Sequence, residues 1–127
     1  MKILITGGKG LIGSKIEEML SNDHQVTVVD NHDTYGIMTK EQLNKLYTWR
    51  TRNWNPKNVV VIDGDVLDRL VCLKAFSHNP DIVIHLAEMV GDPLCEKKPK
   101  KTYAINYLAS MTISNICKNL GISKFIY

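Results

Sequence analysis

Four closely spaced glycines, directly after a short apolar segment, constrain the fold of this chain more than any other feature. Gly7, Gly8, Gly10 and Gly13 lie in the stretch ILITGGKGLIG at 3–13. They give the spacing G-x-G-x-x-G and, counted from Gly7, G-x-x-G-x-x-G. Such glycines allow a tight turn after a strand, a close approach of the backbone to a pyrophosphate, and close packing of the next helix on the sheet. The stretch therefore predicts a strand, a turn and a helix that bind a dinucleotide, although the same turn also occurs without a ligand.

An acidic residue follows at the distance that such a site needs. Asp30 ends the largely apolar run 26–29, about 20 residues beyond the glycines, where a carboxylate binds the adenosine ribose hydroxyls. The helix that we expect from Leu11 would direct its free N–H groups and the positive end of its dipole at the phosphates. Strand, turn, helix, second strand and acid thus occur in the required order.

Strand and helix patterns alternate along the rest of the chain. The expected strands are 2–6, 25–30, 59–63, 81–87 and 124–127, and the expected helices are 11–21, 39–49 with Thr39 as N-cap, 67–77 and 99–120. Segment 88–98 is expected to be a loop. This alternation predicts an α/β fold of one domain, 1–127: a Rossmann-type doubly wound parallel sheet of order 3-2-1-4-5, in three α/β/α layers and incomplete after strand 5.

Composition narrows the class of protein. A chain of 127 residues is long enough to form a core without disulfides or a metal. The chain has an odd number of cysteines, Cys72, Cys95 and Cys117, and none of them has a C-x-x-C spacing. We therefore expect reduced thiols in a cytoplasmic protein. No apolar run has the length of a membrane span, and glycines interrupt the N-terminus too early for a signal peptide core. We therefore expect no metal and no membrane association.

The basic residues are local rather than spread over a surface. The net charge is +3, which is too small to favour nucleic-acid binding. One group surrounds Pro99 at the start of the last helix, where a solvated loop and an anion site are both compatible with the sequence. The other group lies beside two tryptophans, which either cover the sheet or form a subunit contact. The first group consists of Lys97, Lys98, Lys100 and Lys101. The second consists of Arg50 and Arg52, with Trp49 and Trp54 beside them.

A series of motifs in order gives the chain a family resemblance over its whole length. The motifs are TGGKGLIG at 6–13, VVDN at 28–31, GDVLD at 64–68, DIVIHLAE at 81–88, GDPLCEKKP at 91–99, IN at 105–106 and GISKFIY at 121–127. In these motifs the chain resembles the N-terminal part of the extended short-chain dehydrogenase/reductase family, the NAD-dependent nucleotide-sugar epimerases and dehydratases. The resemblance implies a dinucleotide cofactor and, in a longer chain, a nucleotide-sugar substrate.

The resemblance also implies roles for particular residues. It assigns the pyrophosphate to Gly7, Gly10, Leu11, Ile12 and Gly13, the adenosine ribose to Asp30 and Asn31, the adenine to Asp65 and Val66, and the nicotinamide ribose to Leu86 and Ala87. An acid at the ribose repels a 2′-phosphate, so NAD is favoured over NADP. For Asp65 an N-cap role before the helix at Leu67 remains an alternative. His85 is interpreted as a packed strand residue rather than as a catalytic base.

The sequence departs from the family pattern at Glu88 and in its catalytic residues. Glu88 stands where a second alanine is usual, and it either points to solvent or contacts a ribose hydroxyl. The family uses a serine or threonine after the fifth strand and a Tyr-x-x-x-Lys pair, in which the lysine lowers the pKa of the tyrosine. None of the five tyrosines has a lysine four residues later. We therefore expect no catalytic residue in this chain.

Three hypotheses for function follow. The first is the cofactor-binding portion of a nucleotide-sugar epimerase or dehydratase, which binds NAD and does not turn over sugar. The second is a stand-alone dinucleotide-binding or interaction module that pairs with a partner or with itself through its open sheet edge. The third is an enzyme of another class that uses His85, Glu88 or Asp92. This hypothesis is the weakest, because the sequence has no nucleophile with a base at recognisable spacing.

Overall fold

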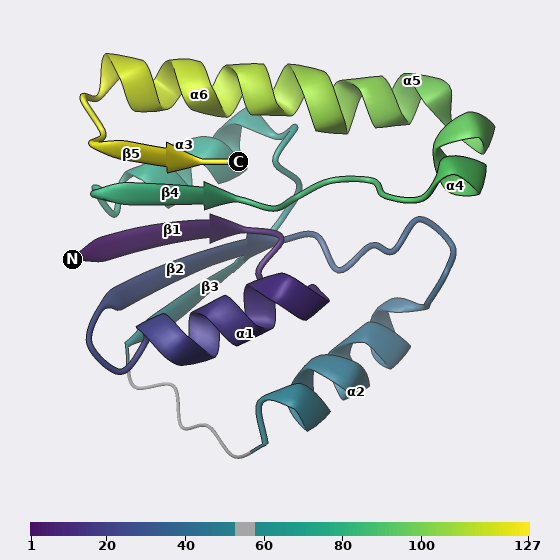
Figure 1. The fold of residues 1–127 in the computed structure, drawn as a ribbon, viewed down its shortest axis with the longest axis horizontal. Helices are drawn as coiled ribbons and strands as arrows, with labels where there is room; N and C mark the ends of the chain where they lie inside the picture. The colour runs from purple at the N-terminus through teal and green to yellow at the C-terminus, as the bar shows by residue number, and fades with distance from the viewer. Residues whose placement is uncertain (53–57) are drawn as a thin grey trace.

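A five-stranded parallel sheet forms the centre of the molecule (Figure 1). The computed structural model describes residues 1–52 and 58–127. The strands are β1 (Lys2–Thr6), β2 (Gln25–Asp30), β3 (Val59–Asp63), β4 (Ile82–His85) and β5 (Lys124–Ile126). Their order is β3-β2-β1-β4-β5, and all four pairings are parallel. The predicted fold class and strand order are confirmed.

Helices connect the strands and lie on both faces of the sheet. They are α1 (Leu11–Leu20), α2 (Lys40–Arg50), α3 (Arg69–Phe76), α4 (Asp92–Lys97), α5 (Pro99–Thr102), the π-helical segment η1 (Tyr103–Ala109) and α6 (Ser110–Asn119). Thr39 caps α2 as predicted, because its hydroxyl accepts from the Gln42 amide while the Gln42 side chain accepts from the Thr39 amide. This reciprocal pair is a capping box, which satisfies two amides at the helix start.

Alternating side chains of β1 divide the core into two halves. Ile3 and Ile5 face α1 and pack with Val26, Val28 and Ile84. Leu4 points to the other face, where side chains of α3, η1 and α6 pack against it, among them Phe76, Ala109 and Ile113. Both halves are shielded from solvent, since Leu4, Ile5 and Val28 are at most 1% exposed. The central strand is therefore packed on both faces up to the point where it enters the glycine turn.

The largest differences from the sequence-based expectation lie at two element ends and in one expected loop. The helix expected from Leu67 begins at Arg69, because the Asp68 carboxylate caps it by accepting from the Leu70 amide. The strand expected to reach Ala87 ends at His85. The expected loop 88–98 contains α4, in which Pro93 occupies a first-turn position that needs no amide hydrogen.

The last helix is continuous in direction but not in hydrogen-bond pattern (Figure 1). The expected helix 99–120 consists of α5, η1 and α6. A π-helical segment widens the turn, and such segments are frequent at functional sites. Periodicity alone does not reveal it, because its apolar residues keep a helical spacing.

Within residues 1–52 and 58–127 no helix is long and apolar enough to cross a membrane, and no group of residues is arranged to hold a metal ion. All three cysteines are described, and each is a free thiol.

Candidate functional site

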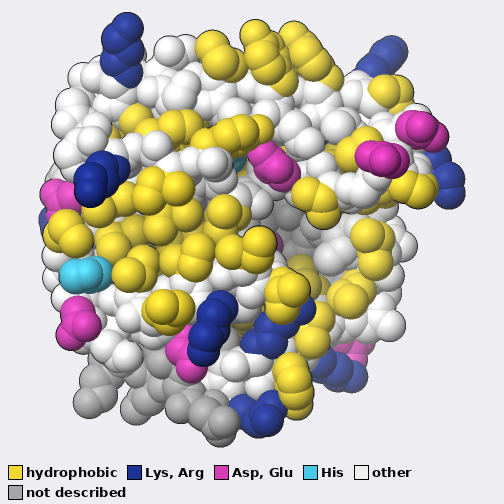
Figure 2. All heavy atoms as spheres, viewed as in Figure 1, with side chains coloured by type: hydrophobic (Ala, Val, Ile, Leu, Met, Phe, Trp, Pro, Cys, Tyr) yellow, Lys and Arg dark blue, Asp and Glu magenta, His cyan; other side chains and the backbone are white. Residues whose placement is uncertain are grey.

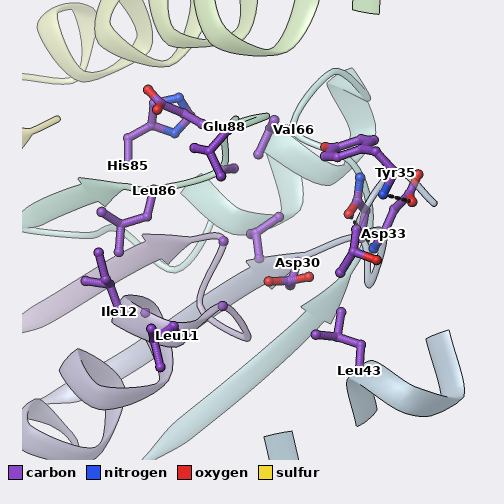
Figure 3. Close-up of a pocket in the computed structure, with 18 of the residues that line it drawn as sticks. Leu11, Ile12, Asp30, Asp33, Tyr35, Leu43, Val66, His85, Leu86 and Glu88 are labelled. Atoms are coloured by element: carbon purple, nitrogen blue, oxygen red, sulfur yellow. Dashed lines mark hydrogen bonds between the residues drawn. The ribbon is translucent and has the colours of Figure 1, made fainter. Parts of the chain in front are cut away.

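A cavity of about 500 Å³ opens at the carboxyl ends of the parallel strands (Figure 3). This edge of a parallel sheet is where ligands bind in open α/β folds. Figure 2 shows the same face hollowed near its centre, with an acidic side chain at the upper rim. The cavity is lined by all the predicted site residues except Asp65, namely Gly7, Gly10, Leu11, Ile12, Gly13, Asp30, Asn31, Val66, Leu86, Ala87 and Glu88.

Two glycines of the turn are required by the packing of the chain itself. Gly7 has φ +71°, and a Cβ there would lie 2.7 Å from the Leu86 carbonyl oxygen. A Cβ on Gly13 would lie 2.5 Å from the Gly7 carbonyl oxygen. The Gly7 amide donates to the Val29 carbonyl at 2.8 Å, which fixes the turn to β2. These glycines bring the turn against both neighbouring strands.

Gly10 differs from them. Its backbone is extended, with φ −66° and ψ 177°, and a Cβ there would meet the Gly7 oxygen alone, at 3.2 Å. The space beside Gly10 therefore belongs to the cavity rather than to packed protein. It is a cradle that a methyl group would fill, which fits the close approach of a phosphate to the backbone.

The start of α1 offers amide hydrogens to that cradle. Gly10 provides no side-chain cap, and no acid lies in the first turn. The first backbone hydrogen bond runs from Ser14 to Gly10, so the amides of Leu11, Ile12 and Gly13 precede the helical ladder. Free amides together with the positive end of the helix dipole bind anions.

Asp30 connects the glycine turn to the end of β2. One of its carboxylate oxygens accepts from the Lys9 amide at 2.9 Å, and the other accepts from the His32 amide at 2.8 Å. Each carboxylate oxygen can accept a further hydrogen bond. Asp30 therefore holds the turn and still has capacity for a ligand hydroxyl in the cavity.

Asp65 lies behind the cavity lining. It accepts from the Asn31 side-chain amide at 3.1 Å and from the Leu67 amide at 2.9 Å. It does not cap α3, because Asp68 does so, and the alternative N-cap interpretation of Asp65 is wrong. Its position supports Asn31, which lines the cavity directly.

A chain of buried hydrogen bonds positions the opposite end of the cavity. His85 is 1% exposed; its Nδ1 lies 2.6 Å from the Thr6 hydroxyl and its Nε2 lies 3.0 Å from the Ser110 hydroxyl. Ser110 donates to the Asn106 carbonyl at 2.8 Å, so it accepts from His85 Nε2–H, and Thr6 donates to Nδ1. Burial lowers the pKa of His85, which keeps the ring neutral. His85 is therefore a structural residue, as the sequence indicated.

The segment after β4 is held by side chains that the sequence did not single out for this role. The Thr6 hydroxyl accepts from the Leu86 and Ala87 amides at 3.2 and 3.3 Å. Asn106, in the π-helical segment η1, accepts from the Met89 amide at 2.9 Å and donates to the Met89 carbonyl at 2.8 Å. Thr6 thus holds the backbone before Glu88, and Asn106 holds it after Glu88.

Glu88 lines the cavity, so it does not point away to solvent. Figure 3 shows its carboxylate beside the His85 ring. It also raises the pKa of the Tyr127 phenol, because a hydrogen bond to the carboxylate favours the protonated phenol and the ionised one would face a negative charge. Tyr127 stacks on His85 with ring centroids 5.8 Å apart and closes this end of the cavity.

Two lysines of the expected basic loop contact the segment after β2. Lys98 donates to the Tyr35 carbonyl at 2.9 Å, while Lys101 lies 3.4 Å from the Asp33 carboxylate and 4.7 Å from the centre of the Tyr35 ring. Tyr35, with φ +59°, and Asp33 line the cavity. Lys98 and Lys101 therefore connect the region of α4 and α5 to the segment of Asp33 and Tyr35, which lines the cavity. These two lysines thus do not lie in a fully solvated loop.

The second basic group lies on α2, away from the cavity lining. Trp49 is 61% exposed, and the Arg52 guanidinium lies 4.6 Å from its ring centre. Arg50 reaches the Lys9 carbonyl at 3.5 Å. Trp54 lies outside the described residues. Trp49 therefore does not cover the sheet.

The cavity carries acidic side chains and no cation. Among the described residues that line it, Asp30, Asp33 and Glu88 are acidic, and none is lysine or arginine. An anion bound at the glycine turn would thus be held by backbone amides and the helix dipole. Asp92, considered for another enzyme class, lies exposed on α4 and does not line the cavity.

Comparisons with known proteins identify the family of the chain. The NAD dependent epimerase/dehydratase family matches residues 3–127. A UDP-glucose 4-epimerase of Caenorhabditis elegans is 32% identical over 131 residues, which cover 100% of this chain and 37% of that protein. The chain thus spans about a third of the length of the relatives it matches.

Solved structures give the same picture. A UDP-N-acetylglucosamine 4-epimerase from Methanobrevibacter ruminantium M1, in complex with UDP-N-acetylmuramic acid, has a TM-score of 0.77 and 32% identity, over 99% of this chain and 36% of that chain. The UDP-glucose 4-epimerase of Thermus thermophilus, in complex with NAD, has a TM-score of 0.76 and 26% identity, over 100% of this chain and 37% of that chain.

Proposed function

Because the chain belongs to the NAD dependent epimerase/dehydratase family, we propose that it is the cofactor-binding portion of a nucleotide-sugar epimerase or dehydratase. The observation that carries this proposal is the cradle at Gly10, which is open to the cavity and faces the free amides of α1. A nicotinamide dinucleotide bound there supplies a hydride acceptor and donor. The cavity volume of about 500 Å³ lies within the usual range of cofactor sites.

The proposed contacts follow the order of the residues along the cavity. Gly7, Gly10, Leu11, Ile12 and Gly13 hold the pyrophosphate, and Asp30 with Asn31 holds the adenosine ribose. Val66 covers the adenine, with Asp65 behind Asn31. Leu86 and Ala87 form the floor under the nicotinamide ribose. These assignments are supported by the cavity lining and by the fixed orientation of Asp30.

We infer a preference for NAD over NADP. Both oxygens of Asp30 are held by the Lys9 and His32 amides, so the carboxylate cannot swing away from a 2′-phosphate without breaking those bonds. A fixed carboxylate beside a phosphate repels it, which is selection by an unfavourable contact. The assay is competition between NAD and NADP, in which equal affinity would refute the preference.

Sugar chemistry is not expected of these 127 residues alone. The Tyr-x-x-x-Lys pair that the family resemblance requires has no match among the tyrosines, and His85, considered as an alternative base, is neutral and enclosed by Thr6 and Ser110. We therefore propose isomerase or oxidoreductase chemistry for a longer protein that contains this part. The free thiols are consistent with a reducing, cytoplasmic location.

Calorimetric titration with NAD tests the proposal. Wild type should bind, and Gly10→Ala should lose most of the affinity with little change in thermal unfolding, because the new Cβ occupies the cradle and meets the Gly7 carbonyl oxygen alone, at 3.2 Å, which needs to shift by only a few tenths of an ångström. Asn115→Ala, at an exposed position of α6, is the matched control and should bind as wild type does. A folded wild-type chain that does not bind NAD at millimolar concentration would refute the proposal.

A second candidate is a dinucleotide-binding or interaction module that assembles through its sheet. β5 pairs with β4, and in the described sheet no strand pairs with its other edge. Ile126 is 49% exposed, and unpaired edges with apolar side chains favour association. Sedimentation at rising concentration tests this candidate, and a strict monomer counts against it.

A further inference from the structure

Glu88 differs from the other two acids of the cavity in having no positively charged or amide partner. Asp30 accepts from two backbone amides, and Asp33 pairs with Lys101. In the described part of the chain no lysine or arginine amine lies within 4 Å of the Glu88 carboxylate. Its negative charge therefore acts on the cavity without compensation.

The groups that surround Glu88 are neutral. His85 is kept uncharged by burial, and Tyr127 carries a phenol. Both rings lie at the same end of the cavity as Leu86 and Ala87 (Figure 3). The paired hydrogen bonds between Asn106 and Met89 hold the backbone next to Glu88. The carboxylate is thus a fixed charge at the end that the proposed function assigns to the nicotinamide.

The two oxidation states of the cofactor differ in charge at that end. The nicotinamide ring is positive when oxidised and neutral when reduced, the difference being a hydride. A nearby carboxylate lowers the free energy of the positive ring and has little effect on the neutral one. We propose that Glu88 makes this cavity bind the oxidised dinucleotide more tightly than the reduced one. This inference depends on the proposed function.

The size of the effect follows from the partial exposure of the site. Glu88 is half-buried, so its interaction with the ring is weakened by solvent but not removed. We expect Glu88 to contribute roughly fivefold to tenfold to the ratio of the two dissociation constants. A tenfold ratio corresponds to about 30 mV in the potential of a two-electron couple, in the direction of a more negative potential.

Parallel titrations with NAD⁺ and NADH test the inference in wild type, Glu88→Gln and Asp92→Asn. Glu88→Gln keeps the shape of the side chain and removes its charge, so the preference for NAD⁺ should fall roughly fivefold to tenfold. Asp92→Asn removes the same charge four residues away at an exposed position that does not line the cavity, and the ratio should not change.

The outcomes separate the two proposals. If both forms bind and Glu88→Gln leaves their ratio at the wild-type value, the role of Glu88 is overturned while the proposed function stands. If folded wild type binds neither form, both are overturned. Should Glu88→Gln fold poorly, Glu88→Ala gives the same test, and a ratio in Glu88→Ala equal to that of wild type overturns the role.

Discussion

The Glu17→Gln substitution should stabilise the protein at alkaline pH. Glu17 lies in α1 and is 0% exposed; one carboxylate oxygen accepts from the Tyr47 hydroxyl at 2.7 Å. Among the described residues the other oxygen, Oε2, has no hydrogen-bond partner. Burial of the charge raises the pKa of Glu17 from 4.5 to about 7, and this outweighs the opposing effects of the Tyr47 hydrogen bond and the nearby Lys9 ammonium.

The raised pKa fixes the sign and the size of the effect. The folded state binds the Glu17 proton more tightly than the unfolded state does, so stability is fully present below pH 4.5 and is lost as the pH rises to about 7. A difference between 4.5 and about 7 corresponds to about 3 kcal/mol. Glutamine resembles the protonated acid, because its oxygen can accept from Tyr47 and its amino group replaces the unpartnered Oε2. It should therefore remove this loss.

Urea unfolding measures the effect across a range of pH. Wild type and Glu17→Gln should have similar free energies of unfolding near about pH 5, and the variant should be more stable by about 3 kcal/mol near about pH 8.5. Other titrating groups contribute equally to both proteins and cancel in the difference. Glu18→Gln, which removes the same charge from the solvent-facing neighbour paired with Lys15, should show no such pH-dependent gain.

The reasoning is refuted if the difference between Glu17→Gln and wild type is constant from acid to alkaline pH. A constant offset would show that the pKa of Glu17 is the same in the folded and the unfolded protein, with the cost of burial offset by Lys9 and Tyr47. A pH-dependent loss of stability in the variant would refute it as well, since it would mean that the ionised form of Glu17 is the stabilising one.

Three further substitutions test the site. Gly13→Ala should lower the free energy of unfolding by about 1 to 3 kcal/mol in urea titrations, because its Cβ would lie 2.5 Å from the Gly7 oxygen, which is backbone; unchanged stability would contradict the packing. Thr6→Val should cost about 1 to 3 kcal/mol in thermal unfolding and weaken NAD binding, since it removes the hydroxyl that pairs with His85 Nδ1 and with the Ala87 amide, while the Leu86 amide keeps the Thr6 carbonyl; Thr6→Ser should retain both stability and binding. Lys101→Met should lower the free energy of unfolding by at most about 1 kcal/mol. It should also speed amide hydrogen exchange in 31–39, because it removes the contacts of Lys101 with Asp33 and Tyr35. Protection equal to that of wild type would show that these contacts do not hold the segment.

The sequence predicts best those features in which one residue type has one physical role. Gly7 and Gly13 are needed by the chain wherever a strand turns this tightly into a helix, and the acid at Asp30 follows at a fixed distance along the same unit. Alternating apolar strands identify the sheet, and the parallel connection rule orders it. For these reasons the fold class and the strand order could be predicted without the structure, as could part of the cavity lining; other lining residues, such as Tyr35 and Tyr127, could not.

The features that the sequence did not reveal depend on contacts between distant segments. Lys101 meets Tyr35 across 66 positions of the chain, and no local pattern announces this contact. Asp65 and Asp68 are both acids near a helix start, and only the geometry shows that Asp68 caps the helix. Glu17 occupies an ordinary position on the inner face of α1, and its unusual pKa arises because burial there, beside Tyr47 and Lys9, disfavours the charged form.

A cavity that holds phosphate by backbone amides has a consequence for the speed of binding. Its described lining carries carboxylates and no lysine or arginine, so the long-range attraction of an anionic dinucleotide comes from the net charge of +3 and from lysines outside the lining, such as Lys98 and Lys101. The close attraction begins when the phosphates reach the first turn of α1. Salt screens the distant attraction and leaves the close contacts largely intact. We therefore expect the association rate constant to fall less steeply with ionic strength than that of a basic cleft.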